Sequence, residues 1–271
     1  MSMSRPRALF FLVVMLFPGL FPGAAVAVEE VERHKLDCNA DFPCYDELRR
    51  RTDFWIQVYR KWTTAQGVFH DANHPERVYS AIEVPDGCRG SSTEVERERN
   101  RIKAQLLDIA RRIEAGQQVR KDADRRMLAL FPGGRAAELR AAASSVRCQQ
   151  GNRDRFEGAL KRYGAYGGIV RKLVVDSGLP EDIHYLPFVE SLYNPGAYSR
   201  VGAAGMWQIM PGTARVLGLD LNATVDERLD LEAATLGAVR YLKESRSRLT
   251  AAATRSEAGP GSGTWRAPEL S

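Results

Sequence analysis

The sequence predicts a mainly α-helical protein in two parts, a helical extension with a short β-hairpin followed by a second helical domain. Three observations lead to this expectation. Apolar residues recur at the helical repeat along most of the chain, β-prone runs cluster before Val84, and the pattern changes from Asn152 onward. We therefore expect an N-terminal extension over 28–151 and a second domain over 152–247.

The first residues indicate export. Arg5 and Arg7 precede an apolar run that ends at Phe21, and the small residues Ala25-Val26-Ala27 follow, which is typical of a secretory signal peptide. A membrane anchor is the alternative, but the run is shorter than the ~20 residues that a bilayer span needs, and prolines and glycines interrupt it. We expect residues 1–27 to be removed by cleavage after Ala27, which leaves a periplasmic or secreted chain without a membrane span.

Export allows the cysteines to be read as two disulfides, formed by Cys38, Cys44, Cys88 and Cys148. Three pairings are open. Cys38 and Cys44 are near enough in sequence to close a local loop, which leaves Cys88 with Cys148. Zinc binding is the alternative, but it favours closely paired thiols such as Cys-x-x-Cys, which the chain lacks. We expect neither a metal nor another cofactor.

The charge of the chain is mildly basic. The formal net charge of +5 falls to +3 when Arg5 and Arg7 are removed. This bias favours an anionic wall polymer or membrane surface, but both signs are interspersed, so an ordinary solvated surface is the simpler interpretation. No segment resembles a nucleic-acid-binding module.

The extension shows several helical stripes and one hairpin. An amphipathic segment over 46–66 precedes β-prone runs over 67–70 and 77–84, and a capping box of Thr93 and Glu96 starts a helix that stops at Gly116. Two shorter helices are expected over 122–131 and 135–146. Because these stripes bring no polar cluster together, we expect the extension to be a scaffold.

The turn of the expected hairpin carries a group of residues that could bind a metal, His70, Asp71 and His74. A turn built from Asp, Asn and Pro explains the same residues, and a third clear ligand is missing.

Glu190 is the candidate catalytic residue. Pro180 suits a helix start, and Pro187 should bend or shorten the helix just before Glu190, since proline removes one backbone donor. The neighbours of the acid are apolar, and partial burial among them raises a carboxyl pKa toward the range of a general acid: Phe188, Val189, Leu192, Tyr193. A glutamate satisfied by a local hydrogen bond is the structural alternative.

A second carboxylate is not available nearby. Ordinary glycosidases use a pair of carboxylates, yet no Asp or Glu occurs between Ser191 and Leu219. Glu190 must therefore act alone, or its partner comes from a later segment that holds Asp226, Glu227 and Asp230.

The region around Glu190 resembles the soluble lytic transglycosylase family, in particular its membrane-bound transglycosylase D type. The resemblance rests on Glu190-Ser191, Asn194-Pro195, the run from Gly202 to Ala214 with its Gly-x-x-Gly-x-Trp-Gln pattern, and Tyr241-Leu242. It is strong over 156–243, while the first half, with Phe54-Trp55 and His70-Asp71, is only loosely similar to the extension of that type.

This resemblance implies a lysozyme-like helical fold and a reaction on peptidoglycan glycan strands. The family cleaves the β-1,4 bond between MurNAc and GlcNAc without water and forms 1,6-anhydro-MurNAc, with one acid, here Glu190, as general acid and then general base. The substrate N-acetyl group replaces a second carboxylate. The resemblance also implies a saccharide-binding role for Ser191, Gly205, Met206, Trp207, Gln208 and Met210. Burial of Trp207 in the core is an equal alternative, and Tyr241 is expected in the core.

The resemblance stops after Lys243. Family members continue into an Ala-Tyr-Asn segment whose tyrosine reaches the catalytic acid, whereas this chain runs through alanines, glycines and prolines. We therefore expect a catalytic domain that is incomplete at its C-terminal end, and a disordered tail over 248–271. The alternative to a transglycosylase is an inactive remnant or a wall-binding module without turnover. A hydrolytic lysozyme is a lesser alternative.

Overall fold

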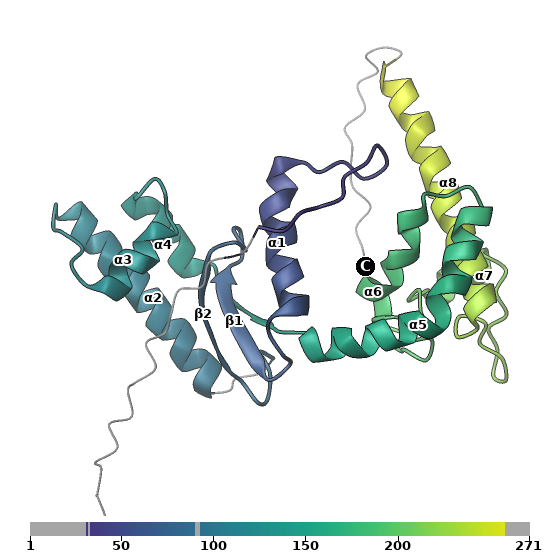
Figure 1. Cartoon of the computed structure of the whole chain (residues 1–271), viewed down its shortest axis with the longest axis horizontal. Helices are drawn as coiled ribbons and strands as arrows, with labels where there is room; N and C mark the ends of the chain where they lie inside the picture. Colours follow the sequence, from purple (N-terminus) through teal and green to yellow (C-terminus); the bar gives the residue numbers. More distant parts are fainter. Residues whose placement is uncertain (1–30, 32, 90–92, 258–271) are drawn as a thin grey trace, which may run out of the picture.

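The structure is a computed structural model that describes residues 31, 33–89 and 93–257. The expected signal peptide and residues 258–271 of the expected tail lie outside these residues. The elements in chain order are α1 (Asp46–Arg60), β1 (Gln66–Asp71), β2 (Val78–Glu83), α2 (Thr93–Glu114), α3 (Asp122–Ala129), α4 (Ala136–Ser144), β3 (Val146–Gln150), α5 (Arg153–Asp176), the 3₁₀ helix η1 (Glu181–Tyr185), α6 (Leu186–Ser191), α7 (Pro211–Val216) and α8 (Leu231–Glu257). The expected mainly helical class is confirmed (Figure 1).

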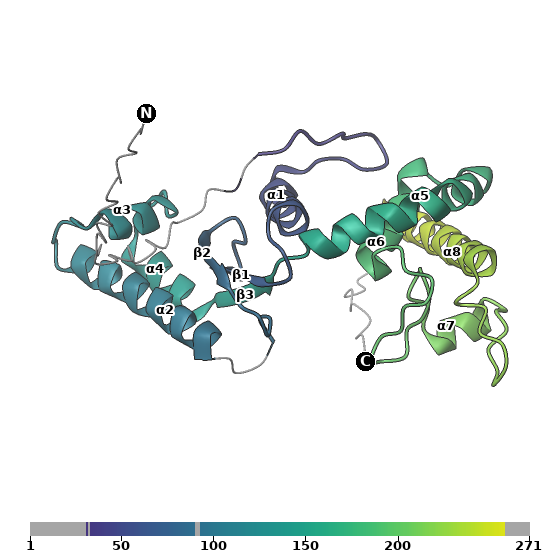
Figure 2. The same ribbon diagram turned by 60° about the horizontal axis from the view of Figure 1, so that its bottom comes forward.

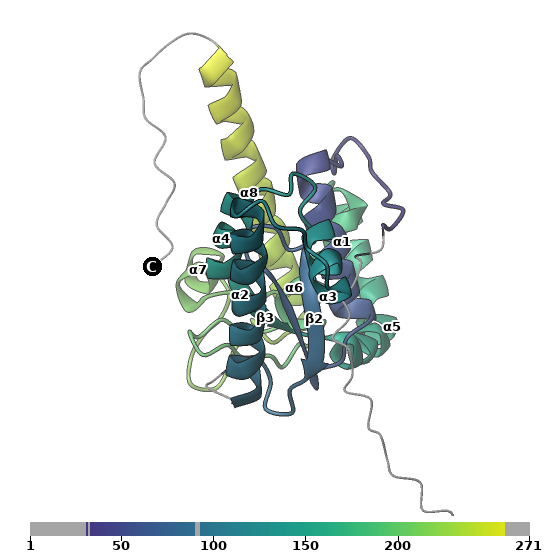
Figure 3. The same ribbon diagram turned by 90° about the vertical axis from the view of Figure 1, so that its left-hand side faces the viewer.

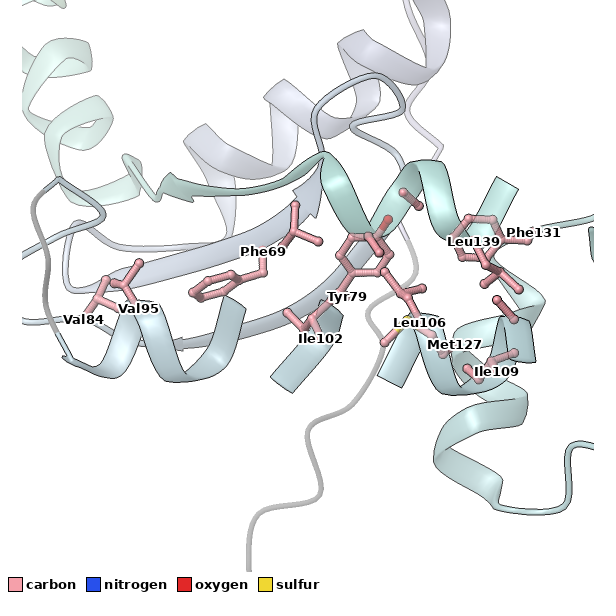
Figure 4. Close-up of a cluster of buried hydrophobic side chains, with 14 residues drawn as sticks. Phe69, Tyr79, Val84, Val95, Ile102, Leu106, Ile109, Met127, Phe131 and Leu139 are labelled. Carbon is pink, nitrogen blue, oxygen red and sulfur yellow. The ribbon is translucent and has the colours of Figure 1, made fainter. Parts of the chain in front are cut away.

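A small antiparallel sheet with the order β2-β1-β3 organises the first half. Side chains alternate between its two faces, as the pleat of a strand requires. Phe69 and Tyr79 point toward α2 and the neighbouring helices, as Figure 4 shows, and join a core with Ile102 and Leu106. The opposite face is covered by α1 and the residues just after it: Phe54 and Val58 of α1, together with Trp62, pack on Val68 and Val78.

Helices α2, α3 and α4 form a layer beside the sheet (Figure 3). The apolar stripe expected from the sequence is buried along α2: Val95, Ile102, Leu106, Ile109. Small residues Ala142 and Ala143 of α4 are buried in the same core, so the backbones of α2 and α4 can approach closely.

Two disulfides brace the first half. Cys38 is bonded to Cys44 and Cys88 to Cys148, so each bond agrees with the pairing suggested by sequence proximity. The second bond joins the segment before α2 to β3. Gly67 lies against it: an added Cβ at Gly67 would come within 2.7 Å of the Cys148 sulfur.

The second half contains α5 to α8 around a separate core. This core collects residues from α5, from the loops after α6 and from α8: Val170, Val174, Tyr193, Met206, Trp207, Ile209, Ala234, Val239. Helix α5 crosses from one half to the other (Figure 2). Backbone bonds anchor its start to the end of α1, since the Asn152 and Arg153 amides donate to the Val58 and Trp62 carbonyls at 2.8 and 2.9 Å.

Two expectations from the sequence are corrected. The helix expected over 135–146 ends at Ser144, and Val146–Gln150 forms the third strand, paired with β1. The disordered tail expected from residue 248 is wrong for 248–257, because α8 continues to Glu257 and projects from the rest of the chain (Figure 1). Within residues 31, 33–89 and 93–257, no helix is both long and apolar enough to cross a bilayer.

Candidate active site

Glu190 lies in the last turn of the short helix α6. The chain turns from the 3₁₀ helix η1 into α6 at Leu186, so that Pro187 occupies the first turn of α6 and costs no helical hydrogen bond. The expected shortening of the helix at Pro187 thus takes the form of a change in helix type. Glu190 is carried near the C-terminal end of a helix of 6 residues.

The Glu190 carboxylate has no hydrogen bond and no ion pair to any residue that the structure describes. Its residue is exposed as a whole, yet nearby protein removes part of the carboxylate from water. This desolvation raises the pKa of Glu190 above its ordinary value, because burial disfavours the ionised form. Glu190 can therefore hold a proton at a higher pH than an ordinary surface glutamate.

The backbone just after Glu190 adopts an unusual conformation. Leu192 and Tyr193 both have positive φ, 55° and 59°, and the Tyr193 amide donates to the Pro187 carbonyl at 2.9 Å. Left-handed conformations cost non-glycine residues about 1–2 kcal/mol each. Arg162 of α5 donates from Nε and Nη2 to the Leu192 carbonyl at 3.0 and 2.9 Å, which satisfies a carbonyl at the helix end.

A hydrogen-bond network links η1 to α5 and to the residues just after α6. The Tyr193 hydroxyl donates to the His184 carbonyl at 2.6 Å, and the Tyr163 hydroxyl lies 2.9 Å from His184 Nε2. His184 Nδ1 faces the Glu181 carbonyl, which can only accept, so Nδ1 is the donor of this bond. The Nε2 contact joins η1 to α5, whereas the Nδ1 bond lies within η1.

Ser191 connects α6 to the glycine-bearing loop. Its hydroxyl donates to the Met206 carbonyl at 2.8 Å and accepts from the Asn194 amide at 3.1 Å. The residue next to Glu190 is therefore fixed directly to the loop from Gly202 to Met210, which we call the 202–210 loop.

The 202–210 loop is closed by backbone pairing and shaped by glycine. Ala204 and Ile209 exchange two hydrogen bonds, of 3.1 and 3.0 Å. Gly205 has φ of 78°, and a Cβ added there would lie 1.6 Å from the Arg228 carbonyl, so no other residue fits without movement.

The saccharide-lining residues expected from the sequence divide into two groups. Met206 and Trp207 are buried, and Trp207 Nε1 donates to the Thr235 hydroxyl at 2.9 Å, which corresponds to the core alternative for this tryptophan. Gln208 donates to the Gly205 carbonyl at 2.9 Å, and Met210 is 42% exposed. Ser191 is half-buried, as Gln208 is, and Gly205 is buried, so Ser191, Gln208 and Met210 are the expected residues whose side chains keep surface that a ligand could reach.

The later carboxylates considered as partners of Glu190 have other structural roles. Asp226 pairs with Arg228 through Nε and Nη2 at 2.9 and 2.8 Å. Glu227 accepts from the Asp220 amide at 2.7 Å, and Asp230 accepts from the Ala233 amide at 2.7 Å as the cap of α8.

An apolar groove of about 400 Å³ lies beside α6, where both halves of the chain meet. Tyr59 of α1 contacts Phe156 of α5, which in turn contacts Phe188 of α6, with ring centroids 5.5 and 5.3 Å apart. The groove includes Val189, the neighbour of Glu190, but Glu190 itself does not line it.

The residues proposed as a metal site stay within the hairpin. His70 is buried with Nδ1 2.9 Å from the Asp71 carbonyl, the Asp71 carboxylate accepts from Ser145 and Asn73, and His74 lies 3.5 Å from Glu76. Across the ranges that the structure describes, no three His, Cys, Asp or Glu side chains gather as metal ligands would.

Sequence reasoning missed Arg162 and Arg228, which bind backbone carbonyls around the site. Arginine bound to carbonyls leaves no periodic signal, because its partners lie 19 to 30 positions away in the chain. Tyr241, expected in the core, is 52% exposed on α8.

Comparisons with known proteins found similarity to part of this chain. A family model described as Transglycosylase SLT domain matches residues 175–259. Membrane-bound lytic murein transglycosylase D of Escherichia coli (strain K12) is 40% identical over 65 residues, which are 24% of this chain and 14% of that protein. A protein of Alteromonas sp. (strain M-1), whose name assigns it to tributyltin chloride resistance, is 31% identical over 65 residues, 24% of this chain and 31% of that protein.

The chain thus matches less than a third of either relative's length. The match to the domain family covers Glu190, Ser191 and the 202–210 loop. Residues 175–259 therefore resemble the Transglycosylase SLT domain, whose fold is lysozyme-like.

Proposed function

We propose that this chain acts in the cell envelope as a peptidoglycan lytic transglycosylase, with Glu190 as its single general acid and base. The observation that carries the proposal is the isolated, partly desolvated Glu190 carboxylate within a segment that matches the Transglycosylase SLT domain. The name of the Escherichia coli relative, a murein transglycosylase, supports peptidoglycan as the substrate.

The proposed reaction has two steps. Protonated Glu190 first gives its proton to the glycosidic oxygen, so that the bond from MurNAc C1 to that oxygen breaks and the GlcNAc end leaves as an alcohol. The C6 hydroxyl of the same MurNAc then attacks C1 while the Glu190 carboxylate takes the hydroxyl proton, which gives 1,6-anhydro-MurNAc and restores the acid. No water is consumed.

The surroundings of Glu190 suit this chemistry. The first step needs a protonated carboxyl near neutral pH, and the raised pKa of Glu190 favours that form. Asp226, Glu227 and Asp230 are held by their own hydrogen bonds, so the substrate N-acetyl group is the reasonable source of stabilisation for the positive charge at C1. Gln208 and Met210 are the best placed residues of the 202–210 loop to touch the sugar.

Localisation forms part of the proposal. The two disulfides fit an oxidising compartment, and the charged and apolar pattern before Ala27 fits a signal peptide. A periplasmic or secreted chain would meet glycan strands directly.

Incubation of the chain, produced from Val28 onward, with purified sacculi tests the proposal. We expect 1,6-anhydro-muropeptides by mass spectrometry, and we expect Glu190→Gln to reduce their rate of release by at least about 100-fold, because it removes the only general acid. Glu181→Gln is the matched control, since Glu181 is exposed and paired with Arg171, and it should keep the parent rate.

Other products would contradict the proposal in defined ways. Muropeptides with reducing MurNAc ends would indicate a hydrolase. Retention on sacculi without any soluble product would indicate a wall-binding module, and activity of Glu190→Gln near the parent level would exclude Glu190 as the acid.

A further inference from the structure

A buried arginine holds both ends of the 202–210 loop. Arg228 is only 5% exposed, and its Nη1 donates to the Gly202 carbonyl at 2.7 Å and to the Ile209 carbonyl at 3.1 Å. Because one nitrogen binds carbonyls seven positions apart, it fixes the width of the loop at its base.

The remaining donors of Arg228 meet a carboxylate that balances its charge. Nε and Nη2 donate to the two oxygens of Asp226, and Asp226 also accepts from the Tyr198 hydroxyl at 3.0 Å. The hydrogen bond from Arg228 is the main cause that lowers the pKa of Asp226, so Asp226 stays ionised. A planar guanidinium with a fixed fork can make all these contacts at once, whereas a lysine ammonium cannot.

The backbone of Arg228 shapes the loop as well. The Arg228 carbonyl occupies the space where a Cβ of Gly205 would lie, at 1.6 Å. Side chain and backbone of one residue therefore define the ends and the middle of the 202–210 loop.

A short series of contacts leads from this loop to the acid. Gly205 precedes Met206, the Met206 carbonyl accepts from the Ser191 hydroxyl at 2.8 Å, and Ser191 adjoins Glu190 at the end of α6. Each link is a direct contact between described residues.

We infer that Arg228 is a positioning residue for the Glu190 site: it sets the 202–210 loop so that the Met206 carbonyl, through Ser191, fixes the end of α6 that carries Glu190. The same loop geometry places Gln208 and Met210 beside the bound glycan. The inference rests on the proposed function for its effect on turnover, but its structural part can be tested without activity.

Arg228→Lys is the main test variant, because it keeps the positive charge and loses the fork. On purified sacculi we expect the maximal rate of anhydro-muropeptide release to fall about 10- to 100-fold, as for a misplaced catalytic group. Arg112→Lys is the matched control: Arg112 is bound to Asp108 on α2 in the first half, and its replacement should leave the rate unchanged.

A chemical rescue separates positioning from loss of fold. Arg228→Ala should regain part of its rate when methylguanidine is added, whereas Glu190→Gln should not. If Arg228→Ala fails to fold, the Arg228→Lys result stands by itself, supported by the following measurement.

Amide hydrogen exchange tests the coupling independently of catalysis. In Arg228→Lys we expect faster exchange at Ala204 and Ile209 in the loop and also at Tyr193 after α6, by about 10-fold, with unchanged exchange in α2. Adding Ser191→Ala should remove the additional effect of Arg228→Lys at Tyr193, since the link through Met206 is already broken.

The outcomes distinguish the two proposals. If the parent chain releases no anhydro product while exchange at Tyr193 responds to Arg228→Lys, the proposed function fails and the positioning role stands. The positioning role would be overturned if Arg228→Lys released anhydro-muropeptides at the rate of the parent chain. It would also be overturned if amide exchange became faster at Ala204 and Ile209 but not at Tyr193.

Discussion

At the scale of single residues, we expect the partly desolvated carboxylate of Glu190 to set the pH dependence of the proposed reaction. Its pKa is raised by desolvation, so the protonated form needed for the first step persists above the ordinary value of 4.5 and is lost as pH rises through the folded-state pKa. We predict that the initial rate of anhydro-muropeptide release, measured between pH 4 and 9, falls as the pH rises through the pKa of Glu190 in the folded chain. A rate that increases with pH over the same range would contradict a protonated Glu190 as the proton donor of the first step.

The same raised pKa predicts a change in stability. The unfolded chain loses the Glu190 proton at a lower pH than the folded chain, so folding stability is highest below the unfolded pKa and declines as pH rises to the folded one. Urea unfolding should therefore show Glu190→Gln to be more stable than the parent at pH 7, with the difference vanishing near pH 4. Glu181→Gln should show the opposite sign, since the hydrogen bond from Arg171 lowers the pKa of Glu181.

Gly205 and Gly212 form a matched pair for testing the 202–210 loop. Gly205→Ala places a Cβ on the Arg228 carbonyl and forces a positive φ, so it should lower the free energy of unfolding by about 3 kcal/mol or more. Gly212→Ala enters open space at the start of α7 and should stay within about 1 kcal/mol of the parent. If urea titrations gave the same free energy of unfolding for Gly205→Ala and Gly212→Ala, the 202–210 loop would have moved to accommodate the added Cβ at position 205.

The sequence predicts Glu190 as the candidate acid, but it does not predict the residues that hold the segment around it. Glu190 and Ser191 were found because apolar neighbours and the nearby glycines leave a local pattern. Burial of Met206 and Trp207 is decided by contacts with later segments such as Thr235 on α8, which a local pattern does not contain.

At the scale of elements, the two disulfides should differ in their contributions. The Cys88–Cys148 bond closes a loop of 60 residues, and chain entropy gives it about 4 kcal/mol, against about 2 kcal/mol for the 6-residue separation of Cys38 and Cys44. We therefore expect the double alanine variant of Cys88 and Cys148 to lose clearly more stability in urea than that of Cys38 and Cys44. The reverse order would show that the denatured chain is already compact near Cys88.

The hairpin and α2 could be predicted, whereas β3 could not. The runs that became β1 and β2 hold β-branched and aromatic residues, and α2 has a capping signal and an apolar stripe. Val146–Gln150 has one buried residue and follows an alanine-rich helix, so it becomes a strand only by pairing with β1, some 80 residues earlier. The length of α8 was underestimated because its last turns are rich in helix formers, alanine and arginine, without an apolar face.

At the scale of the whole molecule, Gly151 controls the junction of the two halves. An added Cβ at Gly151 would lie 2.4 Å from the Trp62 and Thr63 carbonyls, because the start of α5 packs against the end of α1. Gly151→Ala should therefore lower stability by about 2 kcal/mol or more, while Gly164→Ala on the open face of α5 should raise it by about 0.5–1 kcal/mol.

Tryptophan fluorescence can show whether Gly151→Ala lowers the stability of both halves of the chain. Trp62 reports on the cluster between α1 and the sheet, Trp207 reports on the core of the second half, and both are buried. In two variants that keep Trp62 or Trp207 as the single one of the four tryptophans, we expect Gly151→Ala to shift the two urea unfolding midpoints by the same amount. A shift confined to Trp62 would show that the halves unfold separately.

The anchoring of α5 determines how this polypeptide can be divided. The change of pattern near Asn152 resembles a domain boundary in the sequence, but the structure has no linker there. The backbone that ends the sheet passes directly into α5, a helix of 24 residues that contacts α1 near its start and places Val170 and Val174 in the core of the second half. A fragment starting at this boundary would expose Phe156 and free the first turn of α5 from its anchors. The N-terminal half thus holds the start of α5, the first helix of the half that carries Glu190. Separating the two halves would remove these contacts from both of them.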